Sequence, residues 1–477
     1  MQQIPRHTEY RASGLAWVGD IPSHWQTRRN RFLFREVDSR SVHGQETHLS
    51  MSQVHGLVPS QALGRKSLQS ESYAGGKLVA ENDLVLNRLK AHLGVFARAK
   101  QTGVISPDYS VFRSKSDVSV PYCELLFKTP FYVAEFRRRT KGIVEGFWRL
   151  YTDDFYDVSA LTPPRAEQDQ IVAYLRVQDA HIARFIKAKR ELIKLLTEQK
   201  LRIIDRAVTR GLDASVALKP SGIEWLGEVP EHWDVSRLGA CIKTNRTGVW
   251  GSDPSDRNQP DQLICVRVAD FDMEQLAVGI SKLTVRAVTQ SERSGRLLCS
   301  GDILLEKSGG GDKTPVGRVI AFTLDKVSVC SNFVARLVPN TNIVHSAFLL
   351  TVMNHLHARR IVVPYIKQTT GIQNLDSTAY FKLGVALPSL DEQVIILRAL
   401  TEQCQPLNDA IQRAEEEIKL IREYRDRLIA DVVTGQVDVR GWQPGPDEVV
   451  AEEDLAVLAG VEVIDADEEE DDGQENG

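Results

Sequence analysis

The sequence predicts an α+β chain that is built twice: two mixed, largely β domains, each followed by a long helix, with the two helices packed antiparallel and the halves related by a pseudo-two-fold axis. Three observations support this. The string SGLAWVGDIPSHW at 13–25 returns 208 residues later as SGIEWLGEVPEHW at 221–233. PPRAEQDQIVAYL at 163–175 returns 225 residues later as PSLDEQVIILRAL at 388–400. A stripe of apolar residues with helical period continues from each copy of the second string.

These landmarks divide the chain of 477 residues into five parts. We expect a first domain over 1–162, a first helical segment over 163–210, a second domain over 211–387, a second helical segment over 388–436 and an acidic tail over 437–477. Short apolar runs separated by turn formers predict strands, for example KLVAENDLVLNRLK and GVFARA in the first domain. DQLICVRVAD, GDILLEKSGGG and GRVIAF predict the same in the second. Between the landmarks the two domains differ, as expected when a scaffold is kept and its loops vary.

The opening string has neither helical nor strand period. Gly19 and Pro22 suit a turn, and Trp17 and Trp25 are large apolar anchors. We expect the string to hold the start of each domain against the rest of that domain. His24 and its counterpart His232 have no cysteine, serine or carboxylate pattern around them, so we assign them a structural role.

The helical segments carry apolar residues at heptad positions a, d and e. This stripe is wider than a coiled-coil seam, so each helix needs a helical partner and a further surface. The residues expected to serve as the partner-binding surface are Leu175, Ile186, Ile193, Leu196, Leu400, Ile411, Ile418 and Ile421. Pro406 predicts a break between a short helix that starts near Asp391 and a long helix from Pro406 to Val433. The equivalent break in the first copy is expected near Asp179, with that helix ending near Val208.

Charge is distributed unevenly. The 33 residues from Gly445 hold 14 of the 64 acidic residues and no lysine or arginine, which leaves 59 basic and 50 acidic side chains in the preceding chain. The tail is expected to be disordered, with mimicry of DNA charge as the alternative. Six scattered cysteines form no CxxC motif, so neither disulfides nor a metal site is expected. Without an apolar leader or a membrane-length segment, we expect a cytoplasmic protein and no membrane partner.

Two antiparallel helices would relate the two domains by an approximate two-fold axis, which is also the symmetry of duplex DNA. A helix of about 29 residues is about 43 Å long, comparable with the 34–36 Å that separates half-sites one turn apart. The sequence therefore favours two readers held over two unlike half-sites with an unread gap between them.

These strings, together with LPSLDEQ and a long helix ending in VVTG, resemble the specificity subunit of type I restriction–modification systems over residues 10 to 440. The resemblance implies that each globular unit is a target recognition domain and that the helices dock the modification subunits. It implies double-stranded DNA, two methyltransferase subunits and motor-nuclease restriction subunits as partners. S-adenosylmethionine, ATP and Mg would belong to those partners, and this subunit would bind no cofactor and catalyse nothing.

One departure from the family pattern lies in the first domain. TTGIQNL at 369–375 is similar to the glycine-x-glutamine turn of the family, whereas the first domain has VEGFWRL at 144–150. Gly146 is kept against Gly371, but Trp148 replaces Gln373 and Arg149 replaces Asn374. We therefore expect different local contacts around this turn in the first domain.

DNA affinity requires lysine and arginine at phosphates, and base readout requires polar side chains at base edges. Four clusters on expected loops meet this need. The candidate DNA-binding residues are Arg88, Lys90, His92, Arg137, Arg138, Arg139 and Lys141 in the first domain, and Lys307, Lys313, Arg318, Arg359, Arg360 and Lys367 in the second.

Other functions have less support. GGGDKT at 309–314 is not a phosphate loop, because Asp312 separates Gly311 from Lys313. A single-chain DNA methyltransferase or restriction enzyme would need a catalytic [DNS]-P-P-[YFW] loop, and the one Pro-Pro pair lies in TPPR at 162–165. A scaffold that joins partners without DNA is the remaining alternative, and the basic charge before the tail disfavours it.

Overall fold

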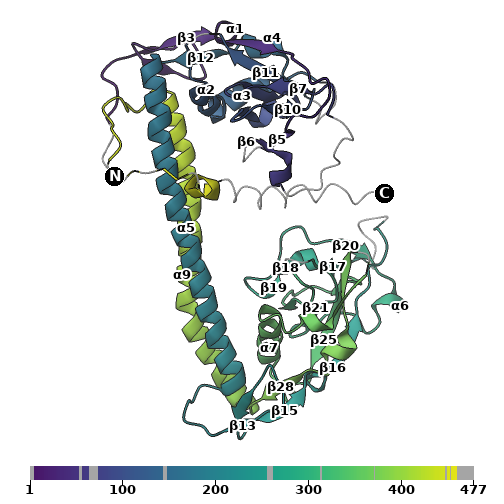
Figure 1. Ribbon diagram of the computed structural model, residues 1–477. Coiled ribbons are helices and arrows are strands. Elements are labelled where there is room, and N and C mark those ends of the chain that lie inside the picture. The colour runs from purple at the N-terminus through teal and green to yellow at the C-terminus, as the bar shows by residue number, and fades with distance from the viewer. Residues whose placement is uncertain are drawn as a thin grey trace. The chain divides into compact units, whose positions relative to one another are not determined.

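The computed structural model describes residues 5–52, 56–63, 73–115, 117–142, 148–254, 262–311, 314–369, 371–445, 448, 450–451 and 453–458. The chain divides into two compact units. Unit 1 comprises residues 1–191 and 414–477, and unit 2 comprises residues 192–413. Each unit therefore contains one globular domain and one half of each long helix (Figure 1).

Unit 1 is built on a four-stranded antiparallel sheet of order β4-β11-β8-β9. Its strands are β4 (Phe34–Val37), β11 (Tyr109–Ser114), β8 (Leu84–Asn87) and β9 (Phe96–Arg98). Four antiparallel pairs surround it: β1 (Tyr10–Ala12) with β2 (Asp20–Pro22), β3 (Gln26–Arg29) with β12 (Ser159–Thr162), β5 (Leu49–Ser52) with β6 (Gly56–Pro59), and β7 (Lys77–Val79) with β10 (Gly103–Ile105). The short helices are α1 (Asn30–Leu33), α2 (Val120–Phe127), α3 (Pro130–Arg139), α4 (Thr152–Tyr156) and the 3-10 helices η1 (Ser60–Leu63) and η2 (Arg88–Leu93).

Unit 2 repeats this plan with a four-stranded antiparallel sheet of order β16-β25-β21-β23. Its strands are β16 (Ile242–Thr247), β25 (Val334–Pro339), β21 (Ile303–Glu306) and β23 (Val319–Ala321). Two three-stranded sheets follow, β20 (Val285–Ala287)-β17 (Gln262–Val266)-β24 (Ser328–Cys330) and β22 (Ser308–Gly309)-β27 (Ile372–Leu375)-β26 (Ile366–Thr369). The remaining pairs are β13 (Leu218–Pro220) with β14 (Glu228–Pro230), β15 (Asp234–Arg237) with β28 (Gly384–Leu387), and β18 (Phe271–Asp272) with β19 (Ala277–Val278). The helices are α6 (Gln290–Arg293), α7 (Ser346–Ala358), α8 (Ser377–Tyr380), η3 (Leu238–Cys241), η4 (Val268–Asp270) and η5 (Val363–Tyr365).

The two four-stranded sheets match strand for strand in chain order. In each, the first strand pairs with the last, the last pairs with the second, and the third lies at the far edge. The opening pair (β1 with β2, or β13 with β14) and the closing pair (β3 with β12, or β15 with β28) also correspond. The predicted duplication and the α+β class are therefore confirmed, and the sheets that have no counterpart belong to the divergent loops.

The two long helices are α5 (Arg165–Arg210) and α9 (Leu390–Val433). In unit 1, Asp179 pairs with Arg425 and Lys189 pairs with Glu417. In unit 2, Lys200 Nζ donates to Asn408 Oδ1 at 2.7 Å. Within unit 1, moving along α5 from residue 179 to 189 moves the ion-pair partner on α9 from residue 425 back to 417. The two helices therefore run antiparallel there, as predicted (Figure 1).

The predicted helix breaks are wrong. α9 is one helix of 44 residues with Pro406 inside it, and α5 is one helix of 46 residues that passes through Asp179. Pro406 is exposed, so the carbonyl that loses its intrahelical donor, that of Glu402, is on an exposed residue and can be hydrated. Leu400 and Cys404 are buried just before the proline, and this packing favours a continuous helix through it. The Asp179 carboxylate accepts two hydrogen bonds from Arg425 of α9, at 2.7 and 3.1 Å.

The chain that follows α9 belongs to the core of unit 1. Val439 is buried with Leu428 and Val432, and the Trp442 ring packs edge-on against Tyr174 at 5.3 Å. Residues 437–442, which the sequence analysis placed in the tail, are therefore part of the folded domain, because their apolar side chains have a core to join. Residues 459–477 lie outside the described residues. Among the helices that the structure describes, none is long and apolar enough to span a bilayer.

Candidate nucleic-acid interface

A carboxylate clamp holds the opening string of each domain to the first turn of the helix that follows that domain. In unit 1, Glu167 accepts the indole N–H of Trp25 at 3.0 Å and contacts His24 Nε2 at 2.8 Å. In unit 2, Glu392 accepts from Trp233 at 2.9 Å and contacts His232 Nε2 at 3.0 Å.

Both tryptophans are buried, so the clamp satisfies an indole donor that would otherwise have no partner. The structural role predicted for His24 and His232 agrees with this arrangement. Sequence inspection missed their carboxylate partners because each lies about 140–160 residues further along the chain.

A glutamine next to each clamp fastens the same helix to the domain core. Gln168 accepts from the backbone N–H of Ser119 at 2.8 Å and donates to the carbonyl of Pro163 at 2.8 Å. Gln393 accepts from His345 at 2.7 Å and donates to Pro388 at 3.0 Å. The repeated Glu-Gln pair therefore fixes how each long helix leaves its domain.

In the first domain, the two predicted basic clusters meet around one edge. The backbone N–H of Leu150 donates to the carbonyl of Arg88 at 3.1 Å, and the neighbouring Arg149 forms an antiparallel bridge with Lys141. α3 packs against η2. The contact is close at Gly94, the residue that follows η2: a Cβ atom added there would lie only 2.7 Å from Val133 Cγ2 of α3. The C-terminal arginines of α3, residues 137–139, are therefore on an element that contacts the loop carrying residues 88, 90 and 92.

The second domain has the same arrangement. Leu375 N–H donates to the carbonyl of Lys307 at 2.8 Å, and the neighbouring Asn374 pairs with Lys367 in the β26–β27 ladder. His357, near the end of α7, contacts the carbonyl of Pro315 at 2.8 Å. This contact joins the helix end that precedes Arg359 and Arg360 to the segment between β22 and β23.

The two edges therefore match: Arg88 with Lys307, Lys141 with Lys367, and the basic end of α3 with the basic end of α7. We name the first the β8 edge (Arg88, Lys90, His92, Arg137–Arg139 and Lys141) and the second the β21 edge (Lys307, Arg318, Arg359, Arg360 and Lys367). Lys313 lies outside the described residues.

Several of these cations already have carboxylate partners inside their own domain. Arg318 forms two hydrogen bonds, of 2.9 and 3.1 Å, with Glu306, whose side chain is fully buried. Arg138 and Arg139 both pair with the buried Glu135 at 2.6 and 2.7 Å. Such arginines neutralise a buried charge first, so they are weaker candidates for DNA contact than the exposed lysines.

Lys141 and Lys367 are those exposed lysines. Each forms one ion pair of 2.7 Å, with Asp154 and Asp376 respectively, and their side chains remain 66% and 73% exposed. An exposed ion pair contributes little to stability, so either lysine can exchange its carboxylate for a phosphate at small cost.

Burial lowers the pKa of Lys307, whose Nζ donates to Thr247 Oγ1 at 2.8 Å. In the first domain, burial and the nearby Arg137 lower the pKa of His92. The lowered pKa favours the neutral form of the His92 ring, and its Nδ1 is buried without a hydrogen-bond partner among the described residues.

Each domain also contains an Asp–Arg pair that sequence reasoning missed. Asp83 accepts two hydrogen bonds of 2.8 Å from Arg113 and one from the backbone of Ala80. Asp302 accepts from Arg336 at 2.6 Å and from the backbone of Cys299 at 2.7 Å. Each aspartate precedes the second strand of its four-stranded sheet, β8 or β21, by one residue, and each arginine is on the last strand, β11 or β25. Aligning NDLVL with GDILL could therefore have revealed the pair.

The expected departure at the GIQNL turn is visible in the contacts. In the second domain, buried Gln373 accepts from the backbone of Val316, and Asn374 accepts from the hydroxyl of Ser308 at 2.6 Å. In the first domain, the Trp148 ring packs edge-on against His92 at 5.8 Å. An aromatic contact thus replaces a polar one at this edge, while Gly146 lies outside the described residues.

The residues predicted to bind partner subunits divide into two groups. Leu175, Ile186, Leu400 and Ile418 are buried within the chain, so they serve its own packing. Ile193, Leu196, Ile411 and Ile421 are partly exposed. The two helices also carry more exposed apolar residues, which the sequence analysis did not include among the partner-binding residues: Phe185, Leu192, Leu195, Leu390, Val394, Ile395, Leu420 and Tyr424.

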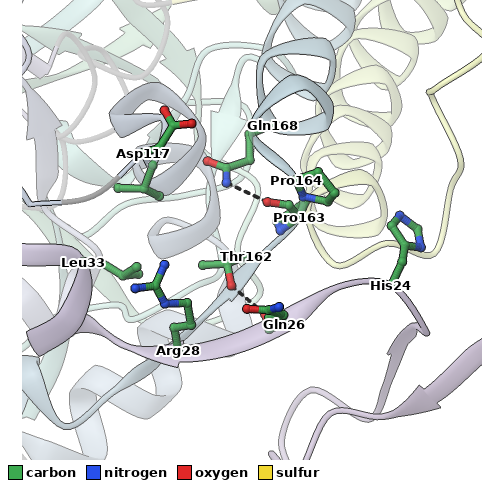
Figure 2. Close-up of a pocket in the computed structure, with 10 residues that line it drawn as sticks. His24, Gln26, Arg28, Leu33, Asp117, Thr162, Pro163, Pro164 and Gln168 are labelled. Atoms are coloured by element: carbon green, nitrogen blue, oxygen red, sulfur yellow. Dashed lines mark hydrogen bonds between the residues drawn. The ribbon is translucent and has the colours of Figure 1, made fainter.

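A pocket of about 180 Å³ lies beside the start of α5 (Figure 2). Its lining includes Arg28, Asp117 and Gln168, with His24 at one side (Figure 2). Thr162 donates to the carbonyl of Gln26 at 2.9 Å across its floor. The volume is below that of a typical small-molecule site, and the pocket lies at the junction between α5 and the strand pair β3–β12.

The chain was compared with known proteins by sequence and by structure. No family model matches the chain. The specificity subunit of the type I restriction enzyme MjaVIII of Methanocaldococcus jannaschii is 20% identical over 371 residues, which is 76% of this chain and 81% of that protein. A putative MjaX specificity subunit of the same organism is 22% identical over 178 residues, 37% of this chain and 40% of that protein.

A chain of similar fold occurs in a solved structure that describes the complex assembly and conformational transition of a type I restriction–modification system. That chain matches with a TM-score of 0.61 at 15% identity, over 87% of this chain and 99% of its own length. The resemblance predicted from the repeats is thus confirmed: this chain is similar in sequence to the specificity subunits of type I restriction enzymes and shares its fold with a chain of such a system.

Proposed function

We propose that this chain is the non-catalytic DNA-recognition subunit of a type I restriction–modification complex and reads an asymmetric, bipartite target through its two domains. The observation that carries the proposal is the pair of matched basic edges on one duplicated scaffold. The β8 edge and the β21 edge occupy corresponding positions, yet their sequences differ, as expected of two readers of two different half-sites.

The partners follow from the same reasoning. Double-stranded DNA would contact the two edges, and two methyltransferase subunits would dock on the exposed apolar residues of α5 and α9, with motor-nuclease subunits joining through them. S-adenosylmethionine, ATP and Mg would be held by those partners. Six unpaired cysteines, five of them buried, support a cytoplasmic location. A single-chain methyltransferase or restriction enzyme is not favoured, because the relatives are specificity subunits.

The target is tested by co-expressing the chain with its methyltransferase subunits and mapping methylated adenines across the host genome. We expect a single motif made of two dissimilar half-sites and a fixed unread gap. Methylation at an undivided motif, or at a palindrome, would contradict two unlike readers.

The edges are tested by the variants Lys141→Ala and Lys367→Ala in the assembled complex. Each is expected to lower the slope of log affinity against log salt by about 1, the effect of one phosphate contact. Lys326→Ala, at an exposed lysine between β23 and β24, is the control and should leave the slope unchanged. If all three variants kept the wild-type slope of log affinity against log salt, DNA would have to contact residues other than Lys141 and Lys367.

A further inference from the structure

Four titratable side chains from four separate segments meet at the first turn of α5 in unit 1. His7 comes from the N-terminal segment, His24 from the opening string, Glu167 from α5 and Asp438 from the chain after α9. His7 is 6% exposed, and neither of its ring nitrogens has a hydrogen-bond partner in the part of the chain that the structure describes. Buried ring nitrogens without partners are rare, because each loses its hydration without compensation.

The neighbours of His7 lie just beyond hydrogen-bond distance. Its Nε2 is 3.9 Å from Glu167 Oε1, and its Nδ1 is 3.6 Å from Asp438 Oδ2. The ligand atoms of His7, His24 and Glu167 all lie within 4.8 Å of one another. An ion among these three would bind His7 through Nε2, and Nδ1–H would then face the carboxylate of Asp438.

This set has the chemistry of a zinc site. Two imidazoles and one carboxylate are ligands that Zn²⁺ prefers, and a histidine bound to a metal usually donates its other ring N–H to a carboxylate. Zinc would replace the proton between His24 Nε2 and Glu167 Oε2, while Glu167 Oε1 keeps the indole hydrogen bond of Trp25. Small rotations of His7 and Glu167 would bring the ligand atoms to zinc distance.

The second domain provides an internal comparison. It repeats the contact between His232 and Glu392, but Ser215 stands at the position that corresponds to His7. The duplicated clamp therefore needs no metal to form. Asp213 stands at the position that corresponds to Asp438, so His7 is the group of this set that the second copy lacks.

We propose that His7, His24 and Glu167 bind one Zn²⁺ ion per chain, with Asp438 orienting His7. The ion joins the N-terminal segment to the start of α5, and Asp438 brings the segment after α9 to the same point. Both ends of the folded chain would thus be fastened beside the first domain. The sequence analysis expected no metal because the ligands are up to 160 residues apart and include no cysteine.

The test uses the full chain without a histidine tag, loaded with Zn²⁺, freed of excess metal and analysed by mass spectrometry. We expect about one zinc ion per chain. His7→Ser, which installs the residue of the second copy, and His24→Gln, at a partly exposed position, should each weaken zinc binding at least about 10-fold. His232→Gln is the matched control and should retain the ion. Co²⁺ in place of zinc should give the absorption of a tetrahedral site in the wild type and in His232→Gln, but not in His7→Ser or His24→Gln.

A chelator should lower the unfolding temperature of the wild type and of His232→Gln, but not that of His24→Gln. If His7→Ser does not fold, His24→Gln decides the question. A wild-type chain that retains no zinc, or an equal zinc content in the wild type and in His24→Gln, would overturn the proposal.

Discussion

Replacing Arg318 separates a role in DNA contact from a role inside the domain. Arg318 was predicted to contact DNA, but its guanidinium makes two hydrogen bonds to Glu306, which is fully buried on β21. In Arg318→Met the Glu306 carboxylate would remain buried without a cation. Breaking a buried pair in this way costs about 3–5 kcal/mol. Because Arg318 is 23% exposed and water can approach it, we expect the lower end, about 3 kcal/mol.

In a unit of this size, that loss lowers the unfolding temperature by about 6–12 °C. The assay is thermal unfolding monitored by circular dichroism, alongside DNA binding measured well below the transition. Lys367→Ala is the control, because its exposed pair with Asp376 should contribute less than about 1 kcal/mol. The double variant Glu306→Leu/Arg318→Met removes both charges and should recover most of the stability.

The reasoning would be refuted if Arg318→Met unfolded at the wild-type temperature and yet lost DNA binding. That result would make Arg318 a DNA contact and its pairing with Glu306 incidental.

The remaining predictions concern pH, backbone and helix length. Burial lowers the pKa of His357 below its ordinary value of 6.5, so the unfolded chain binds a proton at this histidine more readily than the folded chain does. The contribution of neutral His357 to stability is therefore complete above pH 6.5 and is lost as the pH falls below it. His357→Gln should flatten the pH dependence of the unfolding temperature between about pH 7.5 and 5.5. Gly435 has φ 77°, and a Cβ atom there would lie 2.4 Å from Pro22 Cδ, so Gly435→Ala should lower the free energy of unfolding by about 1–3 kcal/mol. At Gly211 the atom nearest to an added Cβ is 3.2 Å away, so Gly211→Ala should lower it less. A larger loss of stability in Gly211→Ala than in Gly435→Ala would contradict this prediction. Four residues inserted into each of α5 and α9 near the boundary between the units would lengthen each helix by about 6 Å, and the mapped target should keep its half-sites and gain a wider gap; changed half-sites with the same gap would disprove this.

The repeats made the fold predictable because the residues that build the skeleton recur in order. Trp25 and Trp233, Glu167 and Glu392, and Gln168 and Gln393 make the same contacts in both domains. Predictions from single residues were wrong where side-chain packing outweighed the helix propensity of the residue. Pro406 predicts a break by its chemistry alone, but buried residues beside it keep α9 continuous.

The candidate site was predictable only in part. Basic residues on loops could be found by type, and the structure brings Arg88 and Lys141 together through neighbouring residues 149 and 150. Sequence could not show which cations are engaged by buried carboxylates, because Glu135 and Glu306 look like ordinary strand or helix residues. His7 gave no signal at all, since its neighbours come from positions 24, 167 and 438.

The core of the first domain includes residues from near the end of the chain. Leu428, Val432, Val433 and Val439 pack with Trp25 and Phe155, and Tyr10 donates to the carbonyl of Gly435 at 3.0 Å. On the ribosome, the first domain emerges early but stays incomplete until the last tenth of the message has been translated. Unit 2, continuous from 192 to 413, has all of its residues sooner. We therefore expect unit 2 to be able to fold before the first domain is complete, and we expect a chain truncated before residue 428 to be cleaved by proteases more readily within its first domain.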